Sequence, residues 1–319
     1  MTTALDDGTP ARGAPWPAFA ALIGGALAMG ASPIFVRLAD VGPFASAFFR
    51  VFLALPVLYA WMRVEDAHAA GPADAGPRFS APVVAAGLFF AGDLFFWHLS
   101  ILHTTVANAT FFATTAPVWV VIFGWLAYRR QVGASALAGL ALCLAGGLAL
   151  VRQSFAFAPE HLVGDVLAAG TGMFFGAYFL AVEKARKRHR AARATFHMTV
   201  VMAVVLAAIA IGAALTLGQR LLPASLHGWA VLVALAWVSH VGGQGLLAVA
   251  LGSLPAMFSS LVIFLEGVAA AGLGWLVLAE AVEHAFGAGN WPPAPLDLNI
   301  QLEDGTRRAL HTRGRCRFA

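Results

Sequence analysis

The sequence predicts an all-α polytopic membrane protein. Of its 319 residues, 60% are hydrophobic and only 11% are charged, whereas a typical soluble protein carries about 25% charged residues. The hydrophobic residues form nine runs near or above about 20 residues, the length that a helix needs to cross a bilayer. Runs of this length do not fit a membrane β-barrel, whose strands are segments of about ten residues with alternating polarity.

The nine runs follow one another with little sequence between them, apart from a polar linker at 65–78. A helix satisfies its backbone hydrogen bonds within the lipid, so each run is expected to form one helix. Pro33, Pro56 and Pro117 fall inside runs, where they are either hinges or simply tolerated. The runs cover residues 16–38, 44–61, 82–101, 106–128, 134–151, 163–182, 196–217, 229–251 and 255–279.

The basic residues lie mostly on one side of these helices. With the N-terminus inside, the inner segments hold eleven Lys and Arg residues, and the outer segments between the first and ninth helices hold three. Positive residues favour the cytoplasmic side, so we expect residues 1–15 to be a cytoplasmic tail. The cluster from Lys184 to Arg193 dominates the count and is expected to fix the orientation; alternatively, it binds an anionic lipid or a partner.

The second half of the chain resembles the first half. A shift of 150 positions places Gly124-Trp125 on Gly274-Trp275, and Gly30-Ala31 occupies a place similar to that of Gly176-Ala177. The offset corresponds to five helices, and an odd number inverts the second copy in the membrane. We therefore expect one repeat at 16–152, a second at 161–280 and an atypical polar tail at 281–319.

Five short motifs stand out along the chain: Met29-Gly30-Ala31-Ser32-Pro33-Ile34-Phe35-Val36-Arg37, Phe48-Phe49-Arg50, Ala116-Pro117-Val118, Leu265-Glu266-Gly267 and Leu278-Ala279-Glu280. Together they resemble the EamA-type branch of the drug/metabolite transporter (DMT) superfamily. The resemblance implies a permease of the inner membrane with five plus five helices in an inverted repeat. It also implies export of amino acids, other small metabolites or drug-like solutes, by alternating access between the two sides.

Two features depart from that family pattern. Gly267 stands where the family has a proline, and no tenth hydrophobic run follows Glu280, because Glu283, His284 and Pro292 interrupt it. About nine helices are therefore visible, with the last one missing or replaced. The alternative function is accordingly a truncated or frameshifted, non-transporting membrane protein of the same fold. A homodimer could supply the absent helix.

Ionisable side chains inside apolar helices are costly, so they are the first candidates for a functional site. Asp93 lies in the third run with Trp97 on the same helical face, and Glu266 lies in the ninth run. We expect these groups to converge on a midplane cavity that binds a polar solute. The predicted substrate-binding residues are Asp93, Trp97, Asn108, Tyr178, His240, Gln244 and Glu266, with Arg50 as a structural or ion-pair residue.

Each assignment has a structural alternative. Asp93 could form an ion pair with Arg50 inside the bundle. His240 could hold two helices together by a hydrogen bond, and the amides could do the same. The aromatic candidates could be packing residues.

Other classes of function lack their sequence signals. No G-x-x-x-x-G-K-[ST] motif occurs, so transport would use a gradient or a partner's energy, with the proton as a candidate coupling ion. Cys143 and Cys316 form neither a disulfide framework nor a metal motif, and we expect no metal or cofactor. An enzyme is not expected, because H-E-x-x-H is absent and Gly92-Asp93 is only a fragment of an aspartyl-protease type motif. The net charge of +4 lies in short loops and does not indicate nucleic-acid binding.

Overall fold

The computed structural model describes residues 16–69, 76–100, 103–104, 109, 112–129, 132–151, 162–278, 298–301 and 307–310. The chain divides into two compact units, Met1–Ala281 and Val282–Ala319. The region where a tenth helix was expected, after Glu280, begins outside the described residues.

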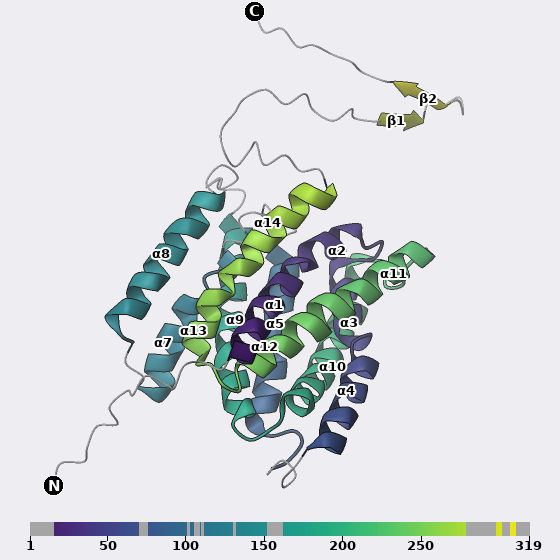
Figure 1. Ribbon diagram of the computed structural model, residues 1–319. Coiled ribbons are helices and arrows are strands. Elements are labelled where there is room, and N and C mark those ends of the chain that lie inside the picture. The colour runs from purple at the N-terminus through teal and green to yellow at the C-terminus, as the bar shows by residue number, and fades with distance from the viewer. Residues whose placement is uncertain are drawn as a thin grey trace, which may run out of the picture. The chain divides into compact units, whose positions relative to one another are not determined.

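The first unit is built from helices (Figure 1). Among the described residues, six helical segments are long and apolar enough to cross a membrane, and three apolar helices are shorter. All nine coincide with the predicted runs, which confirms the all-α membrane fold class. The long segments are Trp16–Leu38, Pro43–His68, Ala81–Ser100, Leu162–Arg186, Ala191–Leu217 and Leu226–Ala250, and the shorter ones are Ala116–Ala127, Leu137–Gly146 and Ala256–Ala270.

Several runs expected to be single helices are broken, and prolines explain two of the breaks. The first run divides into α1 (Trp16–Gly30) and α2 (Ser32–Leu38), and the second divides into α3 (Pro43–Phe52) and α4 (Leu55–His68). Pro33 and Pro56 lie in the first turn of α2 and α4. Proline has no N–H and its ring clashes with the preceding turn, so a helix restarts there with the proline near its beginning. Both prolines were candidates for hinges, and each pair of helices still forms one segment that is long enough to cross a membrane.

The second half contains two further irregularities. The eighth run consists of α11 (Leu226–Ala234), a π-helical segment η2 (Leu235–Gln244) and α12 (Gly245–Ala250). The ninth run divides at Ile263 into α13 (Ala256–Val262) and α14 (Phe264–Leu278). Wide π-helical turns are rare and often occur at functional sites. The remaining helices are α5 (Ala81–Ser100), α7 (Ala116–Tyr128), α8 (Ala134–Val151), α9 (Leu162–Arg186) and α10 (Ala191–Leu217).

The core forms where α5 packs along α9 and α10 packs on α3 and α5. Its largest fully buried side chains include Leu22, Phe90, Tyr178, Phe179 and Met198. In addition, α1 packs on η2, α12 and α14, and α7 packs on α9.

Two glycines bring helix pairs into close contact in the same way. A Cβ atom on Gly30 of α1 would lie 2.6 Å from Ala269 Cβ and 2.8 Å from the carbonyl oxygen of Glu266 on α14. A Cβ atom on Gly176 of α9 would lie 2.6 Å from Trp119 Cβ and 2.8 Å from the carbonyl oxygen of Ala116 on α7. Small residues allow such backbone approach between membrane helices. The contacted positions on α7 and α14 differ by 150, the same offset that relates the two halves of the sequence.

Acidic side chains in the first half of the chain contact the beginnings of two helices in the second half. At one of them, the Glu65 carboxylate accepts a hydrogen bond from the Ala192 N–H at 3.0 Å, and Asp66 forms an ion pair with Arg193 at 2.9 Å. At the other, Asp40 accepts hydrogen bonds from the Ser225 hydroxyl at 3.0 Å and from the Ala224 N–H at 3.1 Å. The contacts of Glu65 and Asp66 hold α4 against the start of α10. Ser225 is the N-cap residue of α11 (Leu226–Ala234), so the contacts of Asp40 hold the turn between α2 and α3 against the start of α11.

The second unit contains a short hairpin in which β1 (Leu298–Gln301) pairs antiparallel with β2 (Arg307–Leu310). Leu298 lies opposite Leu310. The polar tail was predicted without secondary structure, although Leu298, Ile300 and Leu302 alternate with polar residues as in a strand.

Candidate functional site

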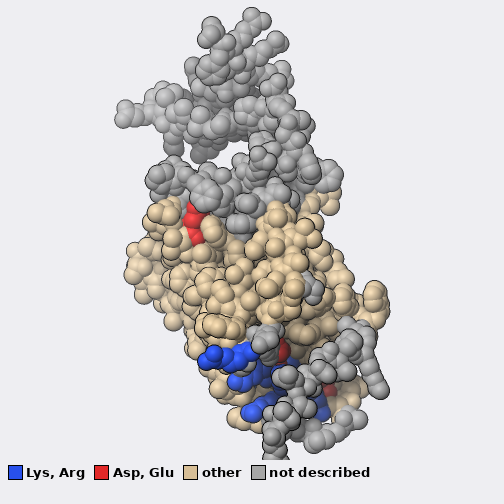
Figure 2. All heavy atoms as spheres, turned by 90° about the vertical axis from the view of Figure 1, so that its left-hand side faces the viewer, with Lys and Arg blue, Asp and Glu red and all other residues tan. Residues whose placement is uncertain are grey.

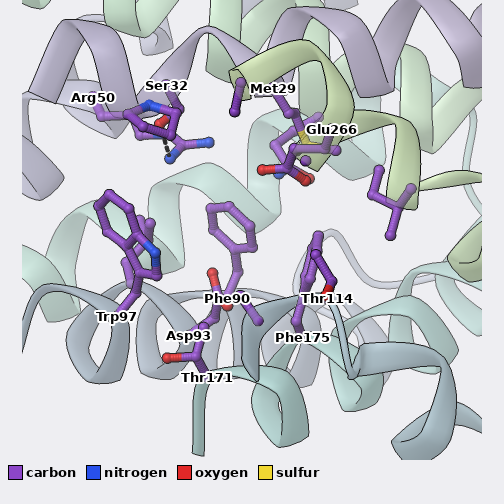
Figure 3. Close-up of a pocket in the computed structure, with 17 residues that line it drawn as sticks. Met29, Ser32, Arg50, Phe90, Asp93, Trp97, Thr114, Thr171, Phe175 and Glu266 are labelled. Carbon is purple, nitrogen blue, oxygen red and sulfur yellow. Dashed lines mark hydrogen bonds between the residues drawn. The ribbon is translucent and has the colours of Figure 1, made fainter. Parts of the chain in front are cut away.

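A pocket lies within the helical unit, between α1–α3 and α14 on one side and α5 and α9 on the other (Figure 3). Its cavity volume is about 70 Å³, which corresponds to roughly five to seven water molecules. The pocket is therefore suited to a compact solute. Its polar and aromatic lining residues are Ser32, Arg50, Phe90, Asp93, Trp97, Thr114, Thr171, Phe175, Gln244 and Glu266.

Arg50 is the basic residue of this lining. It lies in α3 and is buried, with 6% of its surface exposed. Its Nη1 donates a hydrogen bond to the Ser32 hydroxyl at 3.0 Å, and its guanidinium lies 5.5 Å from the centre of the Phe90 ring. Such contacts with a ring face stabilise a cation. The Arg50 Nε has no hydrogen-bond partner in the described part of the chain, so the guanidinium retains one donor for a solute or water.

Two carboxyl groups face the same pocket. Asp93 comes from α5, and Glu266 comes from the first turn of α14, across the pocket from Asp93 (Figure 3). Within the described residues, neither side chain forms an ion pair or accepts a hydrogen bond, and in particular neither is paired with Arg50. The alternative in which Asp93 forms an ion pair with Arg50 is therefore not seen among the described residues.

Aromatic and hydroxyl side chains complete the lining. Phe90, Asp93 and Trp97 are spaced by three and four residues, so one face of α5 carries all three. Thr171 of α9 is buried, and its hydroxyl has no partner among the described residues. Sequence reasoning did not assign Phe90 or Thr171 to the site. The α5 spacing could have indicated Phe90.

A second layer of side chains lies behind the pocket wall. Tyr178 is fully buried and donates a hydrogen bond to Gln244 Oε1 at 2.8 Å, while Gln244 Nε2 contacts Met29 Sδ at 2.9 Å. His240 Nε2 lies 2.9 Å from the Thr199 hydroxyl of α10, and the His240 ring packs 5.9 Å from Phe90. These contacts fix the orientation of Gln244 and Phe90.

The structure thus separates the predicted site residues into three groups. Asp93, Trp97, Gln244, Glu266 and Arg50 line the pocket. Tyr178 and His240 lie behind it and contact lining residues. Asn108 lies outside the described residues.

The fold and the pocket define a class of protein, a multi-pass helical membrane protein with a small pocket that charged side chains line. The chain belongs to the EamA-like transporter family, which matches residues 16–152 and 162–289. This confirms the resemblance to EamA-type members of the DMT superfamily. The family is one of membrane transporters rather than of enzymes.

A comparison with solved structures supports the same fold. One, titled "Crystal structure of protein", superposes with a TM-score of 0.68 and is 18% identical in sequence. The alignment covers 84% of this chain and 92% of the other chain. At that identity the likeness shows the fold alone. A search among curated proteins found no match.

Proposed function

We propose that the protein is a permease that exports a small metabolite, amino acid or drug-like solute by alternating access to the pocket. One observation carries this proposal: a pocket with three ionisable side chains lies between helices of both family matches. Ionisable groups at that depth are costly and usually belong to a transport pathway. Because the sequence has no P-loop, the energy would come from a gradient, with the proton as a candidate coupling ion, or from a partner.

The glycine contacts support an inverted repeat as the structural basis of this mechanism. Gly30 of the first half packs on α14 of the second, and Gly176 of the second half packs on α7 of the first. Such reciprocal exchange is what a pseudo-twofold axis in the membrane plane generates. Two similar bundles could then rock around the pocket that they share. We accordingly propose repeats at 16–152 and 161–280.

The charge distribution supports a cytoplasmic N-terminus in the inner membrane. Figure 2 shows Lys and Arg side chains gathered at one end of the described surface. The junction between α9 and α10 contributes Lys184, Lys187, Arg188 and Arg190. Under the positive-inside rule this end is cytoplasmic. A cytoplasm-specific reporter fused after Lys187 should be active, and a reporter active only outside the cytoplasm should be silent there.

Export can be tested without knowing the solute. The small molecules in the medium of cells that produce the protein would be compared with those of cells that produce Asp93→Asn. At least one solute should accumulate with the wild type and fall to background with Asp93→Asn. Asp66→Asn, which changes a carboxylate at the bundle end, is the matched control and should export normally. Identical media at equal protein levels would contradict export and favour the non-transporting alternative.

A further inference from the structure

The carboxyl groups of Asp93 and Glu266 point to the chemistry of the solute. Both face the pocket, and within the described residues neither has a hydrogen-bond or ion-pair partner. Asp93 is buried and Glu266 is half-buried. A carboxylate in such a place without a partner is disfavoured, so it takes up a proton or acquires a cation. A ligand or proton is therefore required to complete this site.

The single arginine does not neutralise both carboxylates. With all three groups ionised, one guanidinium and two carboxylates give the pocket a formal charge of −1. Arg50 is held by Ser32 and by the face of Phe90, on the far side of the pocket from Asp93. The pocket consequently has room for one further positive charge.

We propose that this charge is the ammonium group of a small organic amine, which binds between Asp93 and Glu266 and displaces a proton that the empty pocket holds. The inference rests on the proposed permease function and specifies its solute. The displaced proton leaves the carboxyl group for water. An amine and a proton thus exclude each other, and their movements across the membrane are coupled in opposite directions.

The aromatic lining fits the same ligand. Trp97 and Phe175 line the pocket together with the two carboxyl groups. The face of an aromatic ring attracts an ammonium group, and its apolar surface covers the hydrocarbon part of the ligand. The guanidinium of Arg50 already lies over the face of the Phe90 ring. The ligand would therefore contact the rings of Trp97 and Phe175.

Other titratable groups around the pair are held by their own partners. On α5 itself, His98 Nδ1 contacts the Leu94 carbonyl oxygen at 2.7 Å, and on η2 His240 contacts Thr199. Tyr178 of α9 donates to Gln244, and α2, which packs on α14, carries Arg37 near its end. Among the described residues on these elements, Asp93 and Glu266 are the acidic groups that face the pocket. Proton exchange is therefore assigned to this pair.

The test uses three probes with the same carbon skeleton and different charge: 2-phenylethylamine, phenylacetate and 2-phenylethanol. Binding to the purified full-length protein would be measured by titration calorimetry in two buffers of different ionisation enthalpy, which reports the protons released. We expect the amine to bind at least about tenfold more tightly than the other two probes. About one proton should be released per amine bound. The release should vanish at higher pH, where the pair has already lost its proton.

Variants assign the effect to the two carboxyl groups. Asp93→Asn and Glu266→Gln should each weaken amine binding at least about tenfold and abolish proton release. Using both keeps the test informative if one variant fails to fold. Asp66→Asn should bind the amine like the wild type. Tighter binding of phenylacetate, equal binding of all three probes, or amine binding without proton release would each overturn the inference.

Transport by reconstituted liposomes separates this inference from the proposed function. Uptake of phenylacetate or phenylethanol instead of the amine would contradict the amine site and leave the permease intact. Amine binding with proton release but without exchange of amine across the liposome membrane would support the site and contradict the permease. Exchange of the amine driven by an opposing proton gradient would support both.

Discussion

The hydrogen bond between Tyr178 and Gln244 connects the pocket wall to the core of α9. Tyr178→Phe removes the hydroxyl that donates to Gln244 Oε1 and leaves this buried oxygen without a hydrogen bond. The loss should lower the free energy of unfolding by about 1–3 kcal/mol. We expect a lower midpoint of thermal unfolding in detergent. Tyr59→Phe is the control, because Tyr59 is 49% exposed on α4, and its midpoint should not change. Equal midpoints for the two variants would show that this hydrogen bond does not stabilise the pocket wall.

Asp40 gives a pH-dependent contribution outside the membrane. Partial desolvation raises the pKa of Asp40, but hydrogen bonds from the Ser225 hydroxyl and from the N–H groups of Ala224 and Ser225 outweigh it, so the pKa lies below the ordinary 3.8. Such a group stabilises the fold above pH 3.8 and loses this effect as the pH falls through its lowered pKa. Asp40→Asn should therefore reduce the unfolding midpoint at pH 6, and the difference from the wild type should shrink below pH 3.8. A difference that stays constant over this range would contradict the assignment.

The charged residues that line the pocket are easier to predict from the sequence than the uncharged residues that contact them. Asp93, Glu266 and Arg50 could be predicted because ionisable groups are costly in apolar helices, and Trp97 follows from its spacing on α5. The position of Tyr178 behind Gln244 could not be predicted, since spacing within one helix does not define its rotation relative to another helix. Whether the other candidates bind solute stays a prediction.

At the scale of the elements, the helix pairs depend on the two close-contact glycines. Gly30→Ala and Gly176→Ala place a Cβ against the backbone and Cβ atoms of α14 and α7, so each should destabilise the protein by about 1–3 kcal/mol. Gly212→Ala on α10 meets no atom within 4 Å and should be neutral or stabilising by up to about 1 kcal/mol. Thermal unfolding of the three variants would test this order. If Gly212→Ala were as destabilising as the other two, close packing at Gly30 and Gly176 would not be the cause.

Hydrophobicity predicts where the helices are but not where they break. Each run is apolar over its whole length, and the signal for a membrane helix does not change at a local interruption. Pro33 and Pro56 offer a local reason for a break, whereas Ile263 has none, because the family's proline near this position is replaced by Gly267. Residue type therefore does not predict the break between α13 and α14.

At the scale of the whole helical unit, the pocket lies between α1 and α14 on one side and α5 and α9 on the other. The pairs α1–α14 and α9–α7 each join one helix from either half of the chain. A rocking motion of these pairs would open the pocket to one side and then to the other. A single pocket would then be reached from both sides of the membrane in turn.

Thiol labelling tests whether the pocket is reached from both sides of the membrane. In a background with Cys143→Ser and Cys316→Ser, Thr114→Cys would place one cysteine on the pocket lining, and Ala86→Cys, fully buried in the core, would be the control. A membrane-impermeant maleimide would be added to right-side-out and to inside-out vesicles. Alternating access predicts that Thr114→Cys is labelled from both sides and Ala86→Cys from neither. Labelling of Thr114→Cys from one side alone would contradict alternating access.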